Sequence, residues 1–170
     1  VEFEWSERLA RWNRTGGVRS SLTREAFPGR VKRRLFVCGI PTLNRYDLLE
    51  RGLDALLRGT VVPDRVFVID NGGSYRGRFG ADPRVNVVRP CQNLGVPRSF
   101  NLIAKLAGEA DTLILNDDLM IGPETVEKML AVDAGVVCCF HWSGYLQTRG
   151  VWAAIGEYDE NYFPAYFDDT

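Results

Sequence analysis

The stretch LFVCGIPTLNR, residues 35–45, decides the fold of this chain. Its first six residues are apolar and Pro41 follows them, a pattern that is typical of a short buried strand. The next stretch, Tyr46 to Leu57, carries leucines at helical spacing and ends before Gly59, which predicts a helix. A strand that leads directly into a helix is the building unit of parallel sheets.

The same alternation continues along the chain. Further strands are predicted over residues 65–70, 85–88, 112–115 and 136–140, and further helices over 98–107 and 124–131. Short apolar strands that alternate with helices predict an α/β fold with a parallel, doubly wound sheet. We expect this sheet to form one domain over residues 35–170. An N-terminal helix over residues 4–13 and a basic arm would precede it, together filling residues 1–34.

The composition excludes several classes of protein. The chain has 170 residues and a net charge of −1, which argues against a protein built mainly to coat nucleic acid. Residues 1–34 carry nine bases and four acids, a net charge of +5, so the remaining residues carry −6. The basic segment fits a solvated helix and linker, or a contact with an anionic acceptor or partner. No run approaches the roughly 20 apolar residues that span a bilayer, so we expect no transmembrane segment.

The four cysteines indicate a compartment rather than a site. None of them forms a C-x-x-C pair, so the sequence indicates neither a zinc knuckle nor a thioredoxin motif. Thiols without a disulfide framework suit a reducing compartment, and we expect the protein to be cytoplasmic.

Polar residues follow three of the predicted strands. They are the segment 41–45, the pair Asp70-Asn71 and the run Asn116-Asp117-Asp118. Ligands of parallel α/β sheets bind beyond the carboxyl ends of the strands, so these residues are candidates for a site. Two adjacent carboxylates repel each other unless a cation or hydrogen-bond donors neutralise them, and their oxygens suit Mg²⁺ or Mn²⁺ with substrate phosphates. An acidic turn that caps the next helix is the structural alternative.

Three other features each have a functional and a structural interpretation. Asp70 ends a strand, where a carboxylate commonly holds ribose hydroxyls, but it also suits an Asx turn. The segment from Asn93 to Asn101 contains the start of a helix, with Arg98 near it. A helix start beside an arginine favours the binding of an anion such as a diphosphate, and an ordinary loop-to-helix transition is the structural alternative. Asp168-Asp169 follows aromatic residues, which raise the pKa of a carboxyl and suit a general base; the alternative is an exposed acidic end.

Taken in order, these segments resemble the family 2 glycosyltransferases of the GT-A fold. The resemblance covers about residues 34–170 and rests on segments 37–45, 68–72, 93–101, 113–118, 151–160 and 162–169. It implies a Rossmann-like, mostly parallel sheet flanked by helices. Enzymes of this family usually continue past the position of Asp168-Asp169, so we expect this chain to be C-terminally trimmed or a naturally minimal version.

The resemblance also implies an activity. The protein would be an inverting, metal-dependent transferase that moves a sugar from a nucleotide-diphosphate sugar, with a UDP-sugar as first candidate, to an acceptor hydroxyl. The family's pattern implies that the residues that bind the donor are Pro41, Thr42, Asn44, Arg45, Asp70, Asn93, Gly95, Arg98, Asn116 and Asp117. The acceptor is open between a saccharide, a lipid-linked glycan, a protein and a modified nucleic-acid base, and the oligomeric state is open too.

The catalytic roles follow from the same resemblance. Asn116-Asp117-Asp118 stands where the family has its D-x-D motif, which implies that Asp118 binds Mn²⁺ or Mg²⁺. Asn116 replaces the usual first Asp and places one charge fewer beside the metal, so we expect weaker metal affinity. Asp169 stands where the family has its base, and Asp168 replaces the Glu that usually precedes that base.

The segment after the fifth predicted strand completes the expected site. His141, Trp142 and Tyr145 would line the pocket for the sugar and the acceptor. Trp142 or Tyr145 suits stacking on a sugar face, and core packing is the alternative for both rings. His141, the only histidine, suits a structural role equally well.

Competing enzyme classes lack their motifs. No G-x-S-x-G elbow, P-loop or G-x-G-x-x-G stretch is present, which argues against a serine hydrolase, a P-loop enzyme and a dinucleotide-binding enzyme. A nucleotidyltransferase shares the α/β layout and the acidic metal site, but the segment 41–45 lacks the Gly-rich basic loop expected of one. An inactive domain that binds sugar nucleotides is the non-enzyme alternative.

Overall fold

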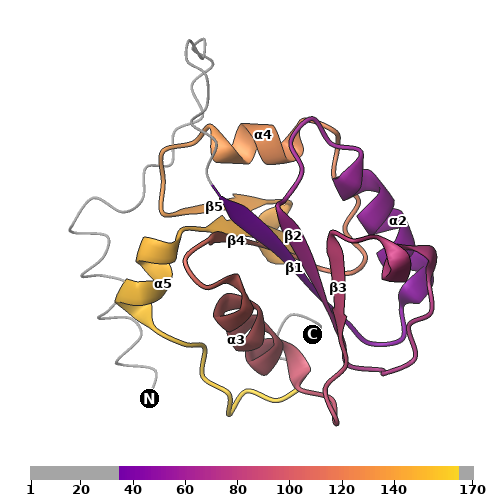
Figure 1. Cartoon of the computed structure of the whole chain (residues 1–170). Helices are drawn as coiled ribbons and strands as arrows, with labels where there is room; N and C mark the ends of the chain where they lie inside the picture. Colours follow the sequence, from indigo (N-terminus) through magenta and orange to yellow (C-terminus); the bar gives the residue numbers. More distant parts are fainter. Residues whose placement is uncertain (1–34, 165–170) are drawn as a thin grey trace.

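The computed structural model describes residues 35–164, and these form one sheet with helices on both faces (Figure 1). The predicted helix over 4–13, the basic arm up to residue 34 and the pair Asp168-Asp169 lie outside the described residues. No helix in the described part of the chain is long and apolar enough to cross a bilayer.

Six strands form the sheet, in the order β3-β2-β1-β4-β6-β5. In chain order the elements are β1 (Phe36–Thr42), α2 (Tyr46–Leu57), β2 (Arg65–Asp70), η1 (Arg78–Ala81), β3 (Val85–Val88), α3 (Gly95–Ala107), β4 (Asp111–Leu115), α4 (Thr125–Leu130), β5 (Val136–Cys139), η2 (His141–Ser143), β6 (Gly144–Gln147) and α5 (Arg149–Ile155). The first four strands in chain order lie where the sequence predicts them, within a residue or two, which confirms the α/β class.

Five strands of the sheet run in one direction, and β6 runs opposite to them. β1 pairs in parallel with β2 and β4, and β2 pairs in parallel with β3. β6 pairs antiparallel with both β4 and β5. β5 therefore runs in the same direction as β1 to β4, as predicted for residues 136–140, and β6, which the sequence did not predict, lies between β4 and β5 and runs opposite to both. Only four residues separate β5 from β6. A connection of that length makes a hairpin, whereas parallel neighbours need a crossover of a dozen residues or more.

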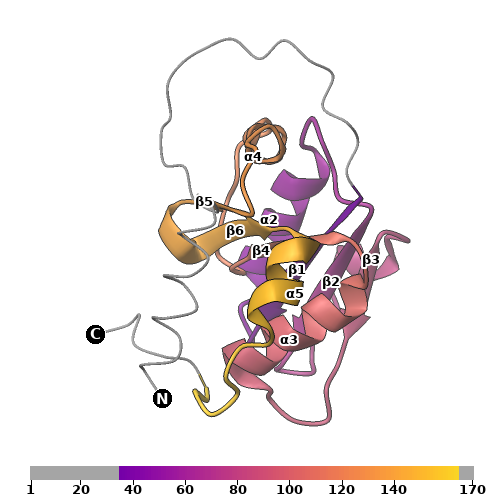
Figure 2. The same cartoon turned by 90° about the vertical axis from the view of Figure 1, so that its left-hand side faces the viewer.

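Alternate residues of the strands pack into two hydrophobic cores on opposite faces of the sheet. Phe36, Cys38 and Ile40 of β1 pack in one core with the buried leucines of α2. Val37 of β1 packs in the other core with Ile103 of α3. Figure 1 shows α2 and α3 on opposite sides of the sheet, and Figure 2 shows α5 beside α3.

β1 and α3 pack closely against each other. A methyl group at Gly39 would lie 2.3 Å from the side chain of Ile103, so β1 needs a glycine where α3 crosses it. Ile103 itself is fully buried. This contact holds α3 against β1, and the predicted site residues gather at the carboxyl end of that strand.

Candidate functional site

The three polar clusters meet at the carboxyl ends of β1, β2 and β4. Thr42 and Asp70 are register partners at the last position of β1 and β2. The hydroxyl of Thr42 donates a hydrogen bond of 2.7 Å to Oδ2 of Asp117, which follows β4. The backbone N–H of Asn71 donates to the carbonyl of Thr42 at 3.0 Å. The structure thus joins the ends of three strands through Thr42.

The acidic run holds its two carboxylates in different surroundings. Asp117 is half-buried, and burial raises its pKa; Asp118 adds to that rise, whereas the Thr42 hydroxyl and Arg45 oppose it. Asp118 is exposed and forms an ion pair with Arg45, at 3.1 Å between Nη1 and Oδ2. Asn116 is exposed, and its backbone N–H donates to the carbonyl of Ser143 at 2.9 Å.

Asp70 is wholly buried, and the protein itself occupies its oxygens. Oδ1 accepts hydrogen bonds from the Tyr46 hydroxyl at 2.8 Å and from the N–H of Gly73 at 2.9 Å. Oδ2 accepts from the N–H of Tyr75 at 2.9 Å and lies 3.5 Å from Nε of Arg89. A buried carboxylate with these partners orders the turn that follows β2 and fastens it to α2.

Residues 41–45 turn the chain from β1 into α2. Pro41 is half-buried near the end of β1. Asn44 is exposed in the left-handed region at φ 61°, which Asn tolerates better than most residues, and its amide oxygen accepts from Tyr46. This turn points the Arg45 side chain at Asp118.

The start of α3 is tied to β2 and to the end of the described chain. Asn71 accepts from the N–H of Leu94 at 2.9 Å and donates to Ser99 at 3.1 Å. Asn93 accepts from the N–H of Gly95 at 2.8 Å. Arg98 lies 3.3 Å from Glu160, which pairs it with the segment after α5.

The β5–β6 turn lies against the acidic run but exposes only part of the predicted pocket lining. His141 and Trp142 are exposed in this turn, and Trp142 has 70% of its surface free. Tyr145 is buried on β6, in edge-to-face contact with Phe100, and its hydroxyl shares a hydrogen bond of 2.7 Å with Tyr158. The structure therefore places Tyr145 in the core behind Trp142, whose ring lies 5.9 Å away.

Sequence reasoning missed two partners of the site. Arg89 follows β3, so the rule that singled out residues after each strand would have found it. From the sequence, Tyr46 is predicted only as the first residue of a helix. Its position directly after the turn 41–45 is the signal that could have identified it, because a tyrosine hydroxyl there can reach the polar residues of that turn. Both side chains contact Asp70.

The oxygens available for a metal come from few residues. Among residues 35–164 no group of three or more His, Cys, Asp or Glu gathers as a metal site. Asp118 is the exposed carboxylate of the run, with the amide of Asn116 two positions away. Such a sparse set fits a divalent cation whose remaining ligands are substrate phosphates and water.

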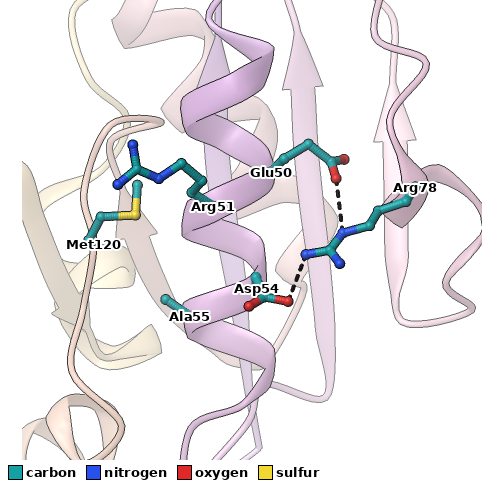
Figure 3. A pocket seen from close by; sticks show the side chains of 6 residues that line it. All are labelled: Glu50, Arg51, Asp54, Ala55, Arg78 and Met120. Carbon is teal, nitrogen blue, oxygen red and sulfur yellow. Dashed lines mark hydrogen bonds and ion pairs between the residues drawn. The ribbon is translucent and has the colours of Figure 1, made fainter.

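A separate pocket lies along α2 (Figure 3). It has a volume of about 430 Å³ and is lined by Glu50, Arg51, Asp54, Ala55, Arg78 and Met120. Arg78 bridges Glu50 and Asp54 at 3.2 and 2.7 Å. Because these charges neutralise one another, the pocket offers no excess charge to a ligand, and it contains none of the predicted site residues.

Comparison with known proteins gives one family and a set of similar folds. The model of the family described as glycosyl transferase family 2 matches residues 38–164. The mannosyltransferase PcManGT from Pyrobaculum calidifontis, in complex with GDP-Man and Mn²⁺, has a similar structure, with a TM-score of 0.65, 17% identity and 94% of this chain covered. TarS from S. aureus, in complex with UDP-GlcNAc, matches 56% of this chain at 23% identity and a TM-score of 0.49. The chain spans 55% of PcManGT and 30% of that TarS chain. No curated protein matches it.

Proposed function

The chain belongs to glycosyltransferase family 2, and on that premise we propose that it transfers a sugar from a nucleotide-diphosphate sugar to an acceptor hydroxyl with inversion. The observation that carries the proposal is the meeting of Thr42 and Asp117 at 2.7 Å, with the exposed Asp118 beside them. This edge of the sheet, beyond the carboxyl ends of parallel strands, is where such folds bind nucleotides. The fold is the GT-A fold that the sequence predicted.

The donor would lie across the ends of β1, β2 and β4. Thr42, Asn44 and Asn116 present polar groups there, and Asp70 keeps the neighbouring turn in place. Asp117 is held by Thr42 and is suited to accept hydrogen bonds from ribose or sugar hydroxyls. Pro41, Asn93, Gly95 and Arg98 belong to the same proposed donor side.

Asp118 would hold the divalent cation, Mn²⁺ or Mg²⁺, with the amide oxygen of Asn116 near it. When bound, such a cation supplies positive charge to the departing diphosphate. Arg45 forms an ion pair with Asp118 in the structure. We propose that this ion pair breaks when the metal and the diphosphate bind, and that the guanidinium then contacts the phosphates.

The acceptor side would be formed by the β5–β6 turn and the end of the chain. Trp142 exposes a ring suited to stack on a sugar face, and His141 lies next to it. Asp169 would take the proton of the acceptor hydroxyl as that oxygen attacks the anomeric carbon from the face opposite the diphosphate. The sugar–phosphate bond breaks as the new glycosidic bond forms.

Release of nucleoside diphosphate tests this proposal. UDP-glucose, UDP-GlcNAc and GDP-Man are incubated with Mn²⁺ and saccharide acceptors, and free UDP or GDP is measured for the wild type and Asp169→Asn. We expect release by the wild type and a loss of at least 100-fold in the variant, with donor binding kept, because only the general base has changed. Equal release by both proteins would contradict the role of Asp169. Donor binding without release by the wild type would favour the inactive domain. Formation of UTP or GTP and a sugar 1-phosphate, when pyrophosphate is added to the nucleotide sugar, would favour a nucleotidyltransferase.

A further inference from the structure

The segment 157–164, between α5 and the acidic end of the chain, is hydrogen-bonded to α3. Most of these hydrogen bonds involve Asn101, a polar residue of which only 1% is exposed. Asn101 Oδ1 accepts a hydrogen bond from the N–H of Tyr158 at 2.8 Å, and its Nδ2 donates to the carbonyl of the same residue at 3.0 Å. This side chain pairs with the backbone as a neighbouring strand would.

The remaining hydrogen of the Asn101 amide extends the contact. Nδ2 donates to Oε1 of Glu160 at 3.0 Å, and the other oxygen of Glu160 lies 3.3 Å from Arg98, one turn earlier on α3. A buried amide is costly when a donor or acceptor is left unpaired, and here both hydrogens and the oxygen have partners. The segment is therefore held at defined positions rather than by apolar packing alone.

The first turn of α3 holds the far end of the same segment. The N–H of Val96 donates to the carbonyl of Pro164 at 2.7 Å. Gly95 has φ 68°, and a methyl group there would lie 2.6 Å from the same carbonyl. Only glycine combines this backbone conformation with so close an approach. Residues 158–164 are thus held on α3 at both ends, by Asn101 at residues 158–160 and by the backbone of Gly95 and Val96 at Pro164.

The start of α3 is also joined to the proposed donor side. Asn71 contacts Leu94 and Ser99 of this region and donates its N–H to the carbonyl of Thr42. Asp169 follows Pro164 by five residues, and five residues of chain extend at most about 17 Å. The place at which α3 holds residue 164 therefore limits where the acidic pair can reach.

We propose that Asn101 is a positioning residue for catalysis: by holding residues 158–160 on α3, it keeps Pro164 in its contact with Val96, and that contact sets the position from which the chain delivers the general base to the donor site. This inference rests on the proposed function, in which Asp169 is that base. Asn101 would not touch the donor, so its loss should slow turnover and leave donor binding intact.

Two variants and one control test the inference. Asn101→Asp keeps the size of the side chain but replaces its NH₂ group by a second carboxylate oxygen. That oxygen would repel the carbonyl oxygen of Tyr158 and the carboxylate of Glu160, to which Asn101 now donates. Asn101→Ala removes the contacts without that repulsion, in case the first variant does not fold. Lys105→Ala is the control, because Lys105 lies on α3 and reaches the same segment only through an exposed ion pair with Glu157 at 3.0 Å.

Three measurements are made on each protein: nucleotide release from the best donor of the panel, the dissociation constant of UDP or GDP with Mn²⁺, and amide hydrogen exchange over residues 157–164. For both Asn101 variants we expect release to fall at least ten-fold, the dissociation constant to change less than two-fold, and exchange to quicken. Lys105→Ala should match the wild type in all three.

Unchanged release in the Asn101 variants would overturn the inference. So would a dissociation constant that rises in step with the loss of release, since that would mark a general structural role. If the wild type releases no nucleotide from any donor, the proposed function fails first. If the wild type and the Asn101 variants release it equally, only the inference about Asn101 fails.

Discussion

At the scale of single residues, the proposed site contains two neighbouring aspartates that have different partners. Asp117 is half-buried and bonded to Thr42, whereas Asp118 is exposed and paired with Arg45. Sequence reasoning located both, because two carboxylates directly after an apolar strand are unusual without a cation or donors nearby. It could not show which partner each one has, since Thr42 and Arg45 lie more than 70 residues away in the sequence.

The Thr42 hydroxyl should support Asp117 measurably. Replacing Thr42 by Val keeps the shape of the side chain and leaves the half-buried Asp117 without its hydrogen bond. We expect the free energy of unfolding to fall by about 1 kcal/mol, a typical value for such a bond. Denaturant unfolding measures it, and Thr42→Ser, which retains a hydroxyl, is the control. A Thr42→Val protein as stable as Thr42→Ser would show that this bond contributes nothing.

Arg45 should compete with the metal for Asp118. An exposed ion pair is worth about 0.2–1 kcal/mol, so removing Arg45 should tighten the binding of Mn²⁺ alone by up to about five-fold. Electron paramagnetic resonance of free Mn²⁺ reports the dissociation constant. The control is Arg51→Ala, which removes an exposed arginine of α2 and should leave the dissociation constant unchanged. Weaker Mn²⁺ binding in Arg45→Ala would mean that Asp118 and Arg45 do not share the site in this way.

At the scale of elements, the structure repeats the predicted strands and helices up to β5 and departs from them afterwards. α3 begins at Gly95 rather than residue 98, because Pro97 is tolerated in the first turn of a helix. β6 and α5 were not predicted. The turn before β6 has Phe140 and His141 at positive φ, a conformation that usually calls for Gly or Asn, so the sequence carries no turn signal there.

The crossing of β1 and α3 should be sensitive to one methyl group. Gly39→Ala places that group against Ile103, and overpacking of this kind costs about 1–3 kcal/mol. Ile103→Ala alone leaves a cavity and costs about 2–5 kcal/mol. In the double variant the new methyl group enters the vacated space, so we expect less destabilisation than the sum by about 1 kcal/mol or more.

Unfolding in denaturant measures this cycle. Gly80→Ala is the matched control, since its methyl group would lie 3.9 Å from the nearest atom, a ring carbon of Tyr75, and should change stability by no more than about 0.5 kcal/mol. Strict additivity in the double variant would show that the two side chains do not share this space.

At the scale of the whole molecule, the site exists because four parallel strands end at the same edge of the sheet. That edge could be predicted from the order of the strands, and with it the neighbourhood of Thr42, Asp70 and Asp117. The hydrogen bond of Asp70 to the N–H of Gly73 is the local Asx turn that the sequence offered as one interpretation. The contacts of Asp70 with Tyr46 and Arg89 could not be predicted, because these residues come from other parts of the chain. The contacts of Asn101 depend likewise on a return of the chain to α3 that no local pattern shows.

Cysteine reactivity should report on the integrity of the whole sheet. Cys38 lies in β1 with no exposed surface, and burial raises the pKa of its thiol, whereas Cys91 is exposed. Because the thiolate is the reactive form, iodoacetamide at neutral pH should modify Cys91 in the native protein and Cys38 only as the protein unfolds. Mass spectrometry of labelled peptides across a denaturant series measures both. Labelling of Cys38 as fast as Cys91 in native protein would contradict the buried position of β1.

In the proposed function, the carboxyl edge of the sheet is a nucleotide-diphosphate site in which Asp118 holds the metal. Calorimetric titration of UDP and of GDP, with and without Mn²⁺, into the wild type and Asp118→Ala tests it most directly. We expect binding that requires Mn²⁺ in the wild type and a loss of at least ten-fold in affinity in the variant, with thermal unfolding unchanged. Mn²⁺-dependent binding of equal strength in both proteins, or no binding of either nucleotide to the wild type, would contradict it.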